Sequence, residues 1–381
     1  MAFSVSLLRD AVAGVREVLV AGGGLAGSAA AMMLARAGRS VQLVERHAGP
    51  KDKICGEFLS IEAQDHLAAL GVDLAAMGAV PVGHIRLVAD GRTVETSLPF
   101  VARGISRRLL DETLLTLAAS AGVQVERGVR VLEVGRSSLR TSKGSYAADT
   151  LLLATGKLPV REAGRAEEAM VPDAHVGFKM HWRAPARVRH RLGGRIELVL
   201  FPGGYAGLQL VEGGIANLCL VIRRNRLAQL GGRWDDVVAT LAPLSPTLAA
   251  LVDGEPLFDK PLTIANLAYG QLPREGDDDP VFRLGDQAAM TASLTGDGMA
   301  IALRSAWLAA RCLLSGKTAA AYRRALTAMV GPQVRRGMIL QRAAESPLPR
   351  WAGLGLLRMQ PGLLRAVTRM TRLPALVPDR P

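Results

Sequence analysis

The order of apolar runs and glycines near the start of the chain predicts a β-α-β unit. The residues EVLVA at 17–21 form an apolar run that ends in glycines, and an alanine-rich segment continues from there to Gly38. The residues SVQLVER at 40–46 then alternate into a second strand. A glycine just past the last helical residue commonly ends a helix, and about 30 residues suffice for a right-handed parallel crossover.

The pattern changes further along the chain. Residues 84–100 alternate with period two around an Asp90-Gly91 turn and predict a hairpin, whereas residues 105–122 carry apolar positions at helical spacing. Between residues 175 and 222, strand-like segments are separated by glycine-rich turns with no long helix between them. This predicts an antiparallel sheet inserted into an α/β frame, and from residue 300 onward the pattern is mostly helical.

Three glycines, Gly22, Gly24 and Gly27, stand between the first strand and its helix. In a GxGxxG turn the first glycine permits the tight turn, the second lets backbone N–H groups approach a pyrophosphate, and the third lets the helix pack closely on the strand. Glu45 ends the second strand, where a carboxylate can accept hydrogen bonds from ribose hydroxyls. The set predicts a site for an ADP-containing cofactor, and a glycine-rich packing turn is the alternative.

A second strand-to-helix turn lies about 260 residues downstream, in the segment FRLGDQAAM. Asp286, after Gly285, can bind a ribityl hydroxyl or can simply cap the following helix. A simple NAD dehydrogenase has no need of such a second turn, so its presence favours FAD.

As an ordered set, these motifs resemble the FAD-dependent aromatic hydroxylase (flavoprotein monooxygenase) and geranylgeranyl reductase superfamily, over roughly residues 16–315. The segments that carry the resemblance are VLVAGGGLAGSAAAMMLARAGRSVQLVER, KICGE, ISRRLLDETLL and RLGDQAAMTASLTGDGMAIAL. The resemblance implies a bound FAD. It places Arg107 near the pyrophosphate, with Arg108 as a competing register, and Asp286 near the ribityl chain. It also places the loop TGDGM, with Gly296, Gly298 and Met299, at the flavin pyrimidine edge.

The expected fold class is therefore α/β, with a Rossmann-like FAD-binding domain, an inserted antiparallel β-sheet substrate domain and a helical C-terminus. We expect the FAD-binding domain to be discontinuous in sequence, because the sheet domain interrupts it. The helical region comes after both. The predicted boundaries are residues 16–80, 101–165 and 270–320 for the FAD-binding domain, 81–100 and 166–269 for the sheet domain, and 321–381 for the basic helical region.

Cys55 lies in the segment KICGE, which resembles the Lys-x-Cys-Gly-Gly segment of the reductase branch, with Glu57 in place of the second glycine. In that branch the segment lies beside the flavin and the substrate pocket. Three roles for Cys55 stay open: contact with the flavin or substrate, a small buried apolar side chain, or a covalent flavin tether.

The chain departs from the superfamily at two positions. After the apolar strand at 150–154, Thr155-Gly156-Lys157 replaces the usual Asp-Gly pair, which leaves the use of NAD(P)H open. Lys157 is either a phosphate contact or an exposed loop lysine. In FPGGYAGLQL, Tyr205 is kept but Gly207 stands where the prenyl reductases carry Trp. The Trp-x-Trp-x-Ile-Pro motif of flavin halogenases does not occur, so we do not expect halogenation.

Two basic side chains are candidates for binding a phenolate oxygen. Lys179 and His181 share one face of a predicted strand by period two, and either could act there if that face lines the pocket. The alternative is a structural role. With Cys55 and Tyr205 they complete the predicted catalytic set.

The chain is basic, with a formal net charge of +13 over 381 residues. Aromatic residues make up only 4%, and no nucleic-acid motif occurs, so nucleic acid is not an expected partner. Three widely spaced cysteines without a CxxC pair favour neither a disulfide framework nor a metal site and fit a reducing cytoplasm. The N-terminus is a poor secretory signal, and no apolar run is long enough to span a membrane.

Much of this charge lies near the C-terminus. From Gly331 to Pro381 there are nine arginines and only two acids, Glu345 and Asp379. Leu, Met and Val alternate with arginine in GLGLLRMQPGLLRAVTRMTRL. One interpretation is a helix that covers the domain with its arginines outward, and the other is a basic amphipathic element in peripheral contact with a membrane.

These observations predict an FAD-dependent oxidoreductase, most specifically a monooxygenase. We expect it to hydroxylate a lipophilic phenolic or polyketide-like molecule through a flavin C4a-hydroperoxide, with electrons from NAD(P)H or an external reductase. The alternatives are a geranylgeranyl-reductase-like enzyme that reduces prenyl or alkene double bonds, and a flavin-binding protein without turnover.

Overall fold

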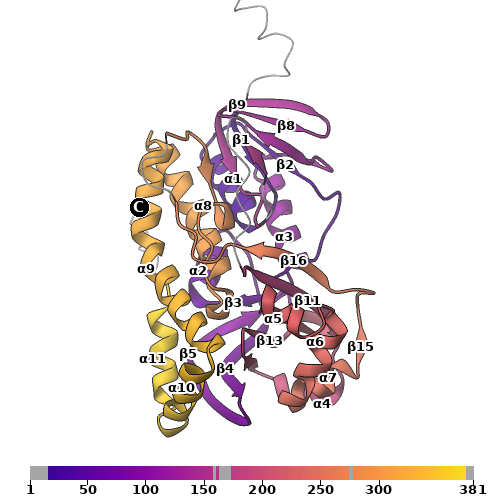
Figure 1. Ribbon diagram of the computed structural model, residues 1–381. Helices are drawn as coiled ribbons and strands as arrows, with labels where there is room; N and C mark the ends of the chain where they lie inside the picture. Colours follow the sequence, from indigo (N-terminus) through magenta and orange to yellow (C-terminus); the bar gives the residue numbers. More distant parts are fainter. Residues whose placement is uncertain (1–15, 158–159, 163–172, 274–277, 375–381) are drawn as a thin grey trace, which may run out of the picture.

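The computed structural model describes residues 16–157, 160–162, 173–273 and 278–374, and Figure 1 shows their arrangement. Within these residues the chain forms an eight-stranded and a nine-stranded sheet. The predicted α/β fold with an inserted sheet and a helical C-terminal region is confirmed. The predicted boundary at residues 165–166 lies outside the described residues.

The first sheet contains the β-α-β unit. Its strand order is β10-β7-β8-β9-β1-β2-β6, with β17 pairing to β9. The strands are β1 (Arg16–Ala21), β2 (Val41–Glu45), β6 (Gln124–Arg127), β7 (Val131–Val134), β8 (Ser138–Thr141), β9 (Gly144–Leu153), β10 (Arg161–Glu162) and β17 (Phe282–Arg283). β9, β1, β2 and β6 run parallel, so their carboxyl ends meet along one edge, where ligands bind in sheets of this kind.

Apolar helices cover one face of this sheet. They are α1 (Leu25–Arg36), α2 (Ile61–Ala69), α3 (Arg107–Ser120), α8 (Gly298–Leu314) and α9 (Ala319–Glu345). Side chains from them form one buried cluster with β1 and β2. α1 can pack so closely because most of its buried positions are small residues, four of them alanines.

The second sheet has the order β15-β11-β14-β13-β12-β4-β5-β3, with β16 pairing to β11. The strands are β3 (Phe58–Leu59), β4 (Val80–Ala89), β5 (Arg92–Gly104), β11 (His175–Arg183), β12 (Arg195–Phe201), β13 (Gly204–Val211), β14 (Ile215–Arg223), β15 (Glu255–Pro256) and β16 (Leu262–Leu267). β4 and β5 form the predicted hairpin. The sheet is not wholly antiparallel, because β4 joins β12 in parallel across a long intervening stretch of chain.

The two faces of this sheet meet different partners. One face packs against α4 (Ala186–Leu192), α5 (Arg224–Gln229), α6 (Trp234–Leu241) and α7 (Pro246–Val252). The opposite face turns toward the first sheet and, around β4 and β5, toward α10 (Pro347–Met359) and α11 (Gly362–Met370). In Figure 1, α9 descends from the first sheet to the second and leads into α10 and α11. No helix within the described ranges is long and apolar enough to cross a bilayer.

Candidate active site

A continuous cavity of about 1070 Å³ lies between the two sheets. Apart from Gly27, every residue predicted to bind the cofactor lines it: Gly22, Gly24, Glu45, Arg107, Gly285, Asp286, Gly296, Gly298 and Met299. Gly27 packs the helix onto the turn instead, because a Cβ there would lie 1.9 Å from the carbonyl oxygen of Gly22. Segments more than 250 residues apart in sequence therefore meet around one cavity.

The glycine-rich turn needs its glycines for physical reasons. Gly22 has φ of 106°, and a Cβ there would approach the Ala154 carbonyl oxygen to 2.5 Å. A Cβ on Gly24 would lie 3.3 Å from Lys53 Nζ and 3.7 Å from the Arg107 guanidinium, so this glycine faces two cations. Backbone N–H groups at a helix start beside two cations suit a pyrophosphate.

Lys53 and Arg107 share the carboxylate of Asp111. Lys53 Nζ lies 2.6 Å from it and Arg107 Nε 2.8 Å from it. Burial opposes the charge of Arg107, but Asp111 and the Cys55 thiol outweigh burial and raise the pKa of Arg107. Burial likewise opposes ionisation of Asp111, yet Arg107 and Lys53 hold the pKa of Asp111 below its usual value. Two basic side chains thus share one carboxylate, which gives the cluster a formal charge of one positive unit.

Glu45 and Thr155 complete this end of the cavity. Glu45 is buried, and its oxygens accept hydrogen bonds from the backbone N–H groups of Gly23 at 2.7 Å and His47 at 2.9 Å. The Thr155 hydroxyl is buried without a hydrogen-bond partner among the described residues. Because a buried polar atom without a partner is costly, the Thr155 hydroxyl is available to a bound ligand. Together with the glycine turn, these groups fit a dinucleotide.

The segment that contains Cys55 is held by polar side chains from the second sheet. Asn217 donates hydrogen bonds to the carbonyl oxygens of Cys55 at 3.1 Å and Gly56 at 2.9 Å, and Gln209 donates to that of Gly56 at 2.9 Å. The Cys55 thiol accepts a hydrogen bond from the Glu57 N–H. Cys55 is partly exposed, lines the cavity and, like the other two cysteines, forms no disulfide.

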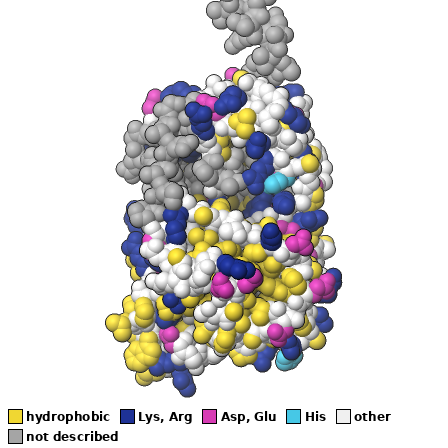
Figure 2. Space-filling view, turned by 45° about the vertical axis from the view of Figure 1, so that its right-hand side comes forward, with side chains coloured by type: hydrophobic (Ala, Val, Ile, Leu, Met, Phe, Trp, Pro, Cys, Tyr) yellow, Lys and Arg dark blue, Asp and Glu magenta, His cyan; other side chains and the backbone are white. Residues whose placement is uncertain are grey.

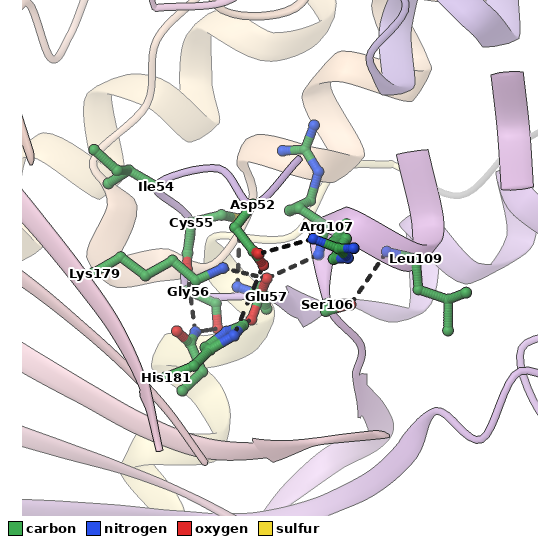
Figure 3. Close-up of polar contacts among 12 residues, drawn as sticks. Asp52, Ile54, Cys55, Gly56, Glu57, Ser106, Arg107, Leu109, Lys179 and His181 are labelled. Carbon is green, nitrogen blue, oxygen red and sulfur yellow. Dashed lines mark hydrogen bonds and ion pairs between the residues drawn. The ribbon is translucent and has the colours of Figure 1, made fainter. Parts of the chain in front are cut away.

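Glu57 is the centre of a buried ionic network (Figure 3). One of its oxygens accepts a hydrogen bond from Lys179 and, at 2.8 Å, from the Arg107 backbone N–H, and the other pairs with His181 Nε2 at 2.8 Å. Burial disfavours the carboxylate, but Lys179 and His181 outweigh burial and keep the pKa of Glu57 below its usual value. Glu57 has φ of 60°, the left-handed conformation that glycine would supply at this position.

Lys179 and His181 do share one face of β11, but they reach Glu57 and are not among the described residues that line the cavity. Asp52 approaches His181 Nδ1 to 3.8 Å, so Asp52, Glu57 and His181 could offer ligand atoms to a metal. Both Glu57 oxygens are already engaged by Lys179 and His181. The arrangement is that of an ion-pair network that fixes the segment carrying Cys55.

Tyr205 lines the cavity beside groups that the sequence analysis did not single out. The hydroxyls of Tyr205 and Tyr269 both contact Ser293 Oγ, at 2.5 and 2.7 Å. Burial raises the pKa of Tyr205 well above its usual value and that of Tyr269 to about 12, so both hydroxyls keep their protons. Ser293 and Tyr269 carry no motif. Ser293 lies two residues before the TGDGM loop, which was a clue to its place in the site, whereas the sequence around Tyr269 held no such clue.

Lys157, left open as a phosphate contact or a loop lysine, lies inside the cavity. Its ammonium donates to the Ile54 carbonyl oxygen at 3.4 Å. Burial works against this charge, but Asp286 and Tyr269 outweigh burial and raise the pKa of Lys157. Cys219 also lines the cavity, and burial raises its pKa to about 12, so its thiol is neutral. Besides Lys51 and Lys53, the Lys157 ammonium and the hydroxyls of Tyr205 and Tyr269 thus line the cavity.

Residues 16–141 match the protein family described as FAD binding domain. The chain is 35% identical over 129 residues to the menaquinone reductase of Mycolicibacterium smegmatis, an alignment that covers 32% of this chain and 31% of that protein. The chain therefore spans about a third of the length of the curated relatives that it matches.

Solved structures of similar fold cover nearly the whole chain. The flavin-dependent brominase Bmp2 superposes with a TM-score of 0.74 at 17% identity, over 93% of each chain. The 2-methyl-3-hydroxypyridine-5-carboxylic acid oxygenase superposes with a TM-score of 0.67 at 19% identity, over 94% of this chain and 97% of that one. Residues 16–141 are thus an FAD-binding domain, and nearly the whole chain shares the fold of this brominase and this oxygenase.

Proposed function

We propose that the protein is an FAD-dependent monooxygenase that hydroxylates a lipophilic phenolic or polyketide-like molecule. The observation that carries the proposal is the continuation of the FAD cavity into an apolar compartment. Ligand pockets typically measure about 300–1000 Å³, so about 1070 Å³ has room for a cofactor and part of a second molecule. The walls of the compartment are apolar and come from the second sheet and the C-terminal helices: Ile85, Leu87, Leu98, Ile196, Leu198, Leu200, Leu354, Leu357, Leu364 and Val367.

The polar groups at the junction favour a phenol as the reacting end of the substrate. Lys157 supplies a positive charge. Tyr205, Ser293 and Tyr269 have three hydroxyl hydrogens and share two hydrogen bonds, so one O–H stays free to donate to a ligand. An ammonium and neutral hydroxyls in a site of low polarity stabilise a phenolate oxygen. A phenolate is more electron-rich than a phenol, and electron-rich rings accept oxygen more readily.

FAD supplies the redox chemistry and the activation of O₂ when it is bound. The residues of this chain hold it and shield it. The glycine turn, Arg107 and Glu45 bind the nucleotide portion, and the segment 53–57, fixed by Glu57, lies between this portion and the second sheet. The apolar walls exclude water, which otherwise competes with the substrate for the activated oxygen. NAD(P)H, directly or through a reductase, is the proposed electron donor.

The test is oxygen consumption coupled to NAD(P)H oxidation by the FAD-loaded protein. A series of 4-alkylphenols with methyl, octyl and pentadecyl chains serves as substrates, and products are identified by mass. We expect one oxygen atom to be added, with a higher kcat/KM for the longer chains. NAD(P)H oxidation that neither consumes O₂ nor adds oxygen to any phenol would refute the proposal.

A second candidate is a reductase of prenyl or alkene double bonds. It is favoured by the name of the relative from Mycolicibacterium smegmatis, menaquinone reductase, and by the similarity of the segment around Cys55 to the reductase branch. The same assay without oxygen separates the two activities, because an alkene reductase turns over a prenylquinone anaerobically and a monooxygenase does not. If neither NADH nor NADPH, with or without a reductase, reduces the flavin, a binding protein without turnover is favoured.

A further inference from the structure

Helix α10 is apolar on two opposite faces. Leu354 and Leu357 face inward and line the cavity, with Leu354 buried. Leu348, Trp351 and Met359 recur at spacings of three and eight residues on the other face and are 80%, 55% and 82% exposed. A helix that is apolar all round is normally buried in a protein core or in lipid, and an isolated surface helix is normally polar on its outer face. The outer face of α10 is therefore largely open to solvent, and the Arg92 guanidinium, 4.8 Å from the centre of the Trp351 ring, covers only part of it.

The cavity opens to the surface at this place. Leu356 on α10 and Met370 at the end of α11 both line the cavity, and both are more than half exposed. A side chain can both line the cavity and be exposed to solvent only where the cavity opens to the surface. The apolar compartment thus leads from the flavin-binding region to an opening framed by α10 and α11, and the exposed apolar face of α10 borders this opening. Figure 1 shows both helices at the lower left of the molecule, and in Figure 2 hydrophobic side chains gather at the lower left as well as across the middle of the lower half.

The charged residues of α10, α11 and the few residues after α11 are all positive. Residues 347–374 contain five arginines and no acid. Arg350 pairs with Asp90 and Arg372 with Asp297, but Arg358, Arg365 and Arg369 are exposed and have no ion pair within the described part of the chain. Short helices with an apolar face flanked by exposed arginines are typical of elements that lie in the interface of an anionic bilayer.

We propose that α10 and α11 dock the protein on the surface of an anionic lipid bilayer, so that the mouth of the cavity opens into the acyl region. Leu348, Trp351 and Met359 enter the bilayer interface, while Arg358, Arg365 and Arg369 contact the lipid headgroups. A lipophilic substrate then passes from the bilayer to the flavin site without crossing water. The docking rests on the exposed surface alone, whereas the delivery of substrate rests also on the proposed function.

Sedimentation with vesicles tests the docking. FAD-loaded protein is mixed with sucrose-filled vesicles of phosphatidylcholine containing 30% phosphatidylglycerol, or of phosphatidylcholine alone. We expect binding to the anionic vesicles that weakens with salt. Each arginine near the surface contributes about five-fold to binding, so R358Q/R365Q/R369Q should bind about a hundred-fold more weakly. L348E/M359E should lose binding by at least about ten-fold.

Two control variants carry substitutions of the same kinds at exposed positions outside α10 and α11. R191Q/R233Q/R324Q removes three exposed arginines that lie outside α10 and α11, and L314E adds a charge at an exposed leucine on α8. Both controls should bind as the wild type does. Equal binding by L348E/M359E and wild type, or equal loss in both arginine triples, would overturn the proposal. A stable dimer that L348E/M359E converts to monomer, together with no vesicle binding, would assign this face to a second copy and overturn it too.

A second measurement separates docking from catalysis. Hydroxylation of water-soluble 4-methylphenol should be equal in wild type and L348E/M359E, because neither residue lines the cavity. Hydroxylation of 4-pentadecylphenol supplied in anionic vesicles should fall at least about ten-fold in the variant, in parallel with binding. If the wild type binds vesicles but hydroxylates no phenol, the proposed function fails and the docking stands. If the wild type hydroxylates both phenols, and L348E/M359E binds the vesicles and hydroxylates 4-pentadecylphenol as well as the wild type does, the docking proposal fails and the proposed function stands.

Discussion

Replacing Glu57 by glutamine tests how much the buried ionic network around Glu57 contributes to the free energy of unfolding. This network holds the segment that contains Cys55. The substitution keeps the size of the side chain and an oxygen that can accept from the Arg107 backbone N–H, but it removes the negative charge. Lys179 is completely buried, and Glu57 is its only ion-pair partner among the described residues. Glu57→Gln therefore leaves a buried ammonium without a counter-charge.

The cost follows from the burial of Lys179. Removing one partner of a buried ion pair typically destabilises a protein by about 3–5 kcal/mol, which is a large part of a usual folding free energy of about 5–15 kcal/mol. Lys179→Met removes the other charge and should cost a comparable amount, because Glu57 then stays buried with only His181 to balance it. The double variant removes both charges. We expect it to be destabilised by about 1–3 kcal/mol less than the sum of the two single variants.

Urea unfolding, followed by tryptophan fluorescence and by circular dichroism, measures these free energies, and Trp182 and Trp234 report on the domain that holds β11. The pKa of Glu57 is lower in the folded protein than its usual value of 4.5. Its contribution to stability is therefore complete above about pH 4.5 and is lost as the pH falls through the lower native value. The Gln variant should lack this part of the acid dependence. A loss below 1 kcal/mol for Glu57→Gln, or strict additivity in the double variant, would refute the reasoning.

Three further changes test other parts of the site. Gly24→Val should reduce the FAD content of the purified protein at least about ten-fold, because its side chain would fill the space before Lys53 and Arg107; normal FAD content would contradict this role. Lys157→Met should raise KM for phenols about ten-fold or more and leave the FAD content unchanged, and an unchanged KM would exclude substrate contact. Burial raises the pKa of Asp297 to about 7, so its effect on stability is most favourable below pH 3.8 and is lost as the pH rises to 7. Asp297→Asn should therefore be more stable than wild type at pH 8 in urea unfolding, and a less stable variant would contradict the assignment.

The sequence predicted the cofactor domain well because its signals are local. The β-α-β unit, the glycine turn and Glu45 all lie within 30 residues, and Gly27 is required by a contact inside this unit, with the Gly22 carbonyl oxygen. The close contact at Gly22 comes instead from the distant Ala154. The hairpin around Asp90 and Gly91 was also correct, and both residues have positive φ. Such features depend on neighbouring residues, which a sequence displays directly.

The partners of Lys179 and His181 could not be predicted in the same way. Period two correctly placed both on one face of β11, but their partner Glu57 is more than 120 residues away in sequence. A clue did exist in the apolar strands, where Gln209 and Asn217 interrupt otherwise hydrophobic runs. Buried polar side chains in such runs need partners, and these two donate to the carbonyl oxygen of Gly56, in the segment that contains Glu57. The parallel pairing of β4 with β12 was missed because it depends on how distant parts of the chain meet.

The cofactor loop and the mouth of the cavity are mechanically linked. Arg372, just past α11, lies 2.9 Å from the carboxylate of Asp297, donates a hydrogen bond to the Thr295 carbonyl oxygen and places its guanidinium 5.5 Å from the ring centre of Phe100. Thr295 and Asp297 belong to the TGDGM loop, which lines the cavity through Thr295, Gly296, Gly298 and Met299. If α11 moves away from the mouth of the cavity, either the Arg372–Asp297 ion pair lengthens or the TGDGM loop moves together with α11. Because protonation of Asp297 near pH 7 weakens the ion pair, the restraint on α11 is strongest at alkaline pH.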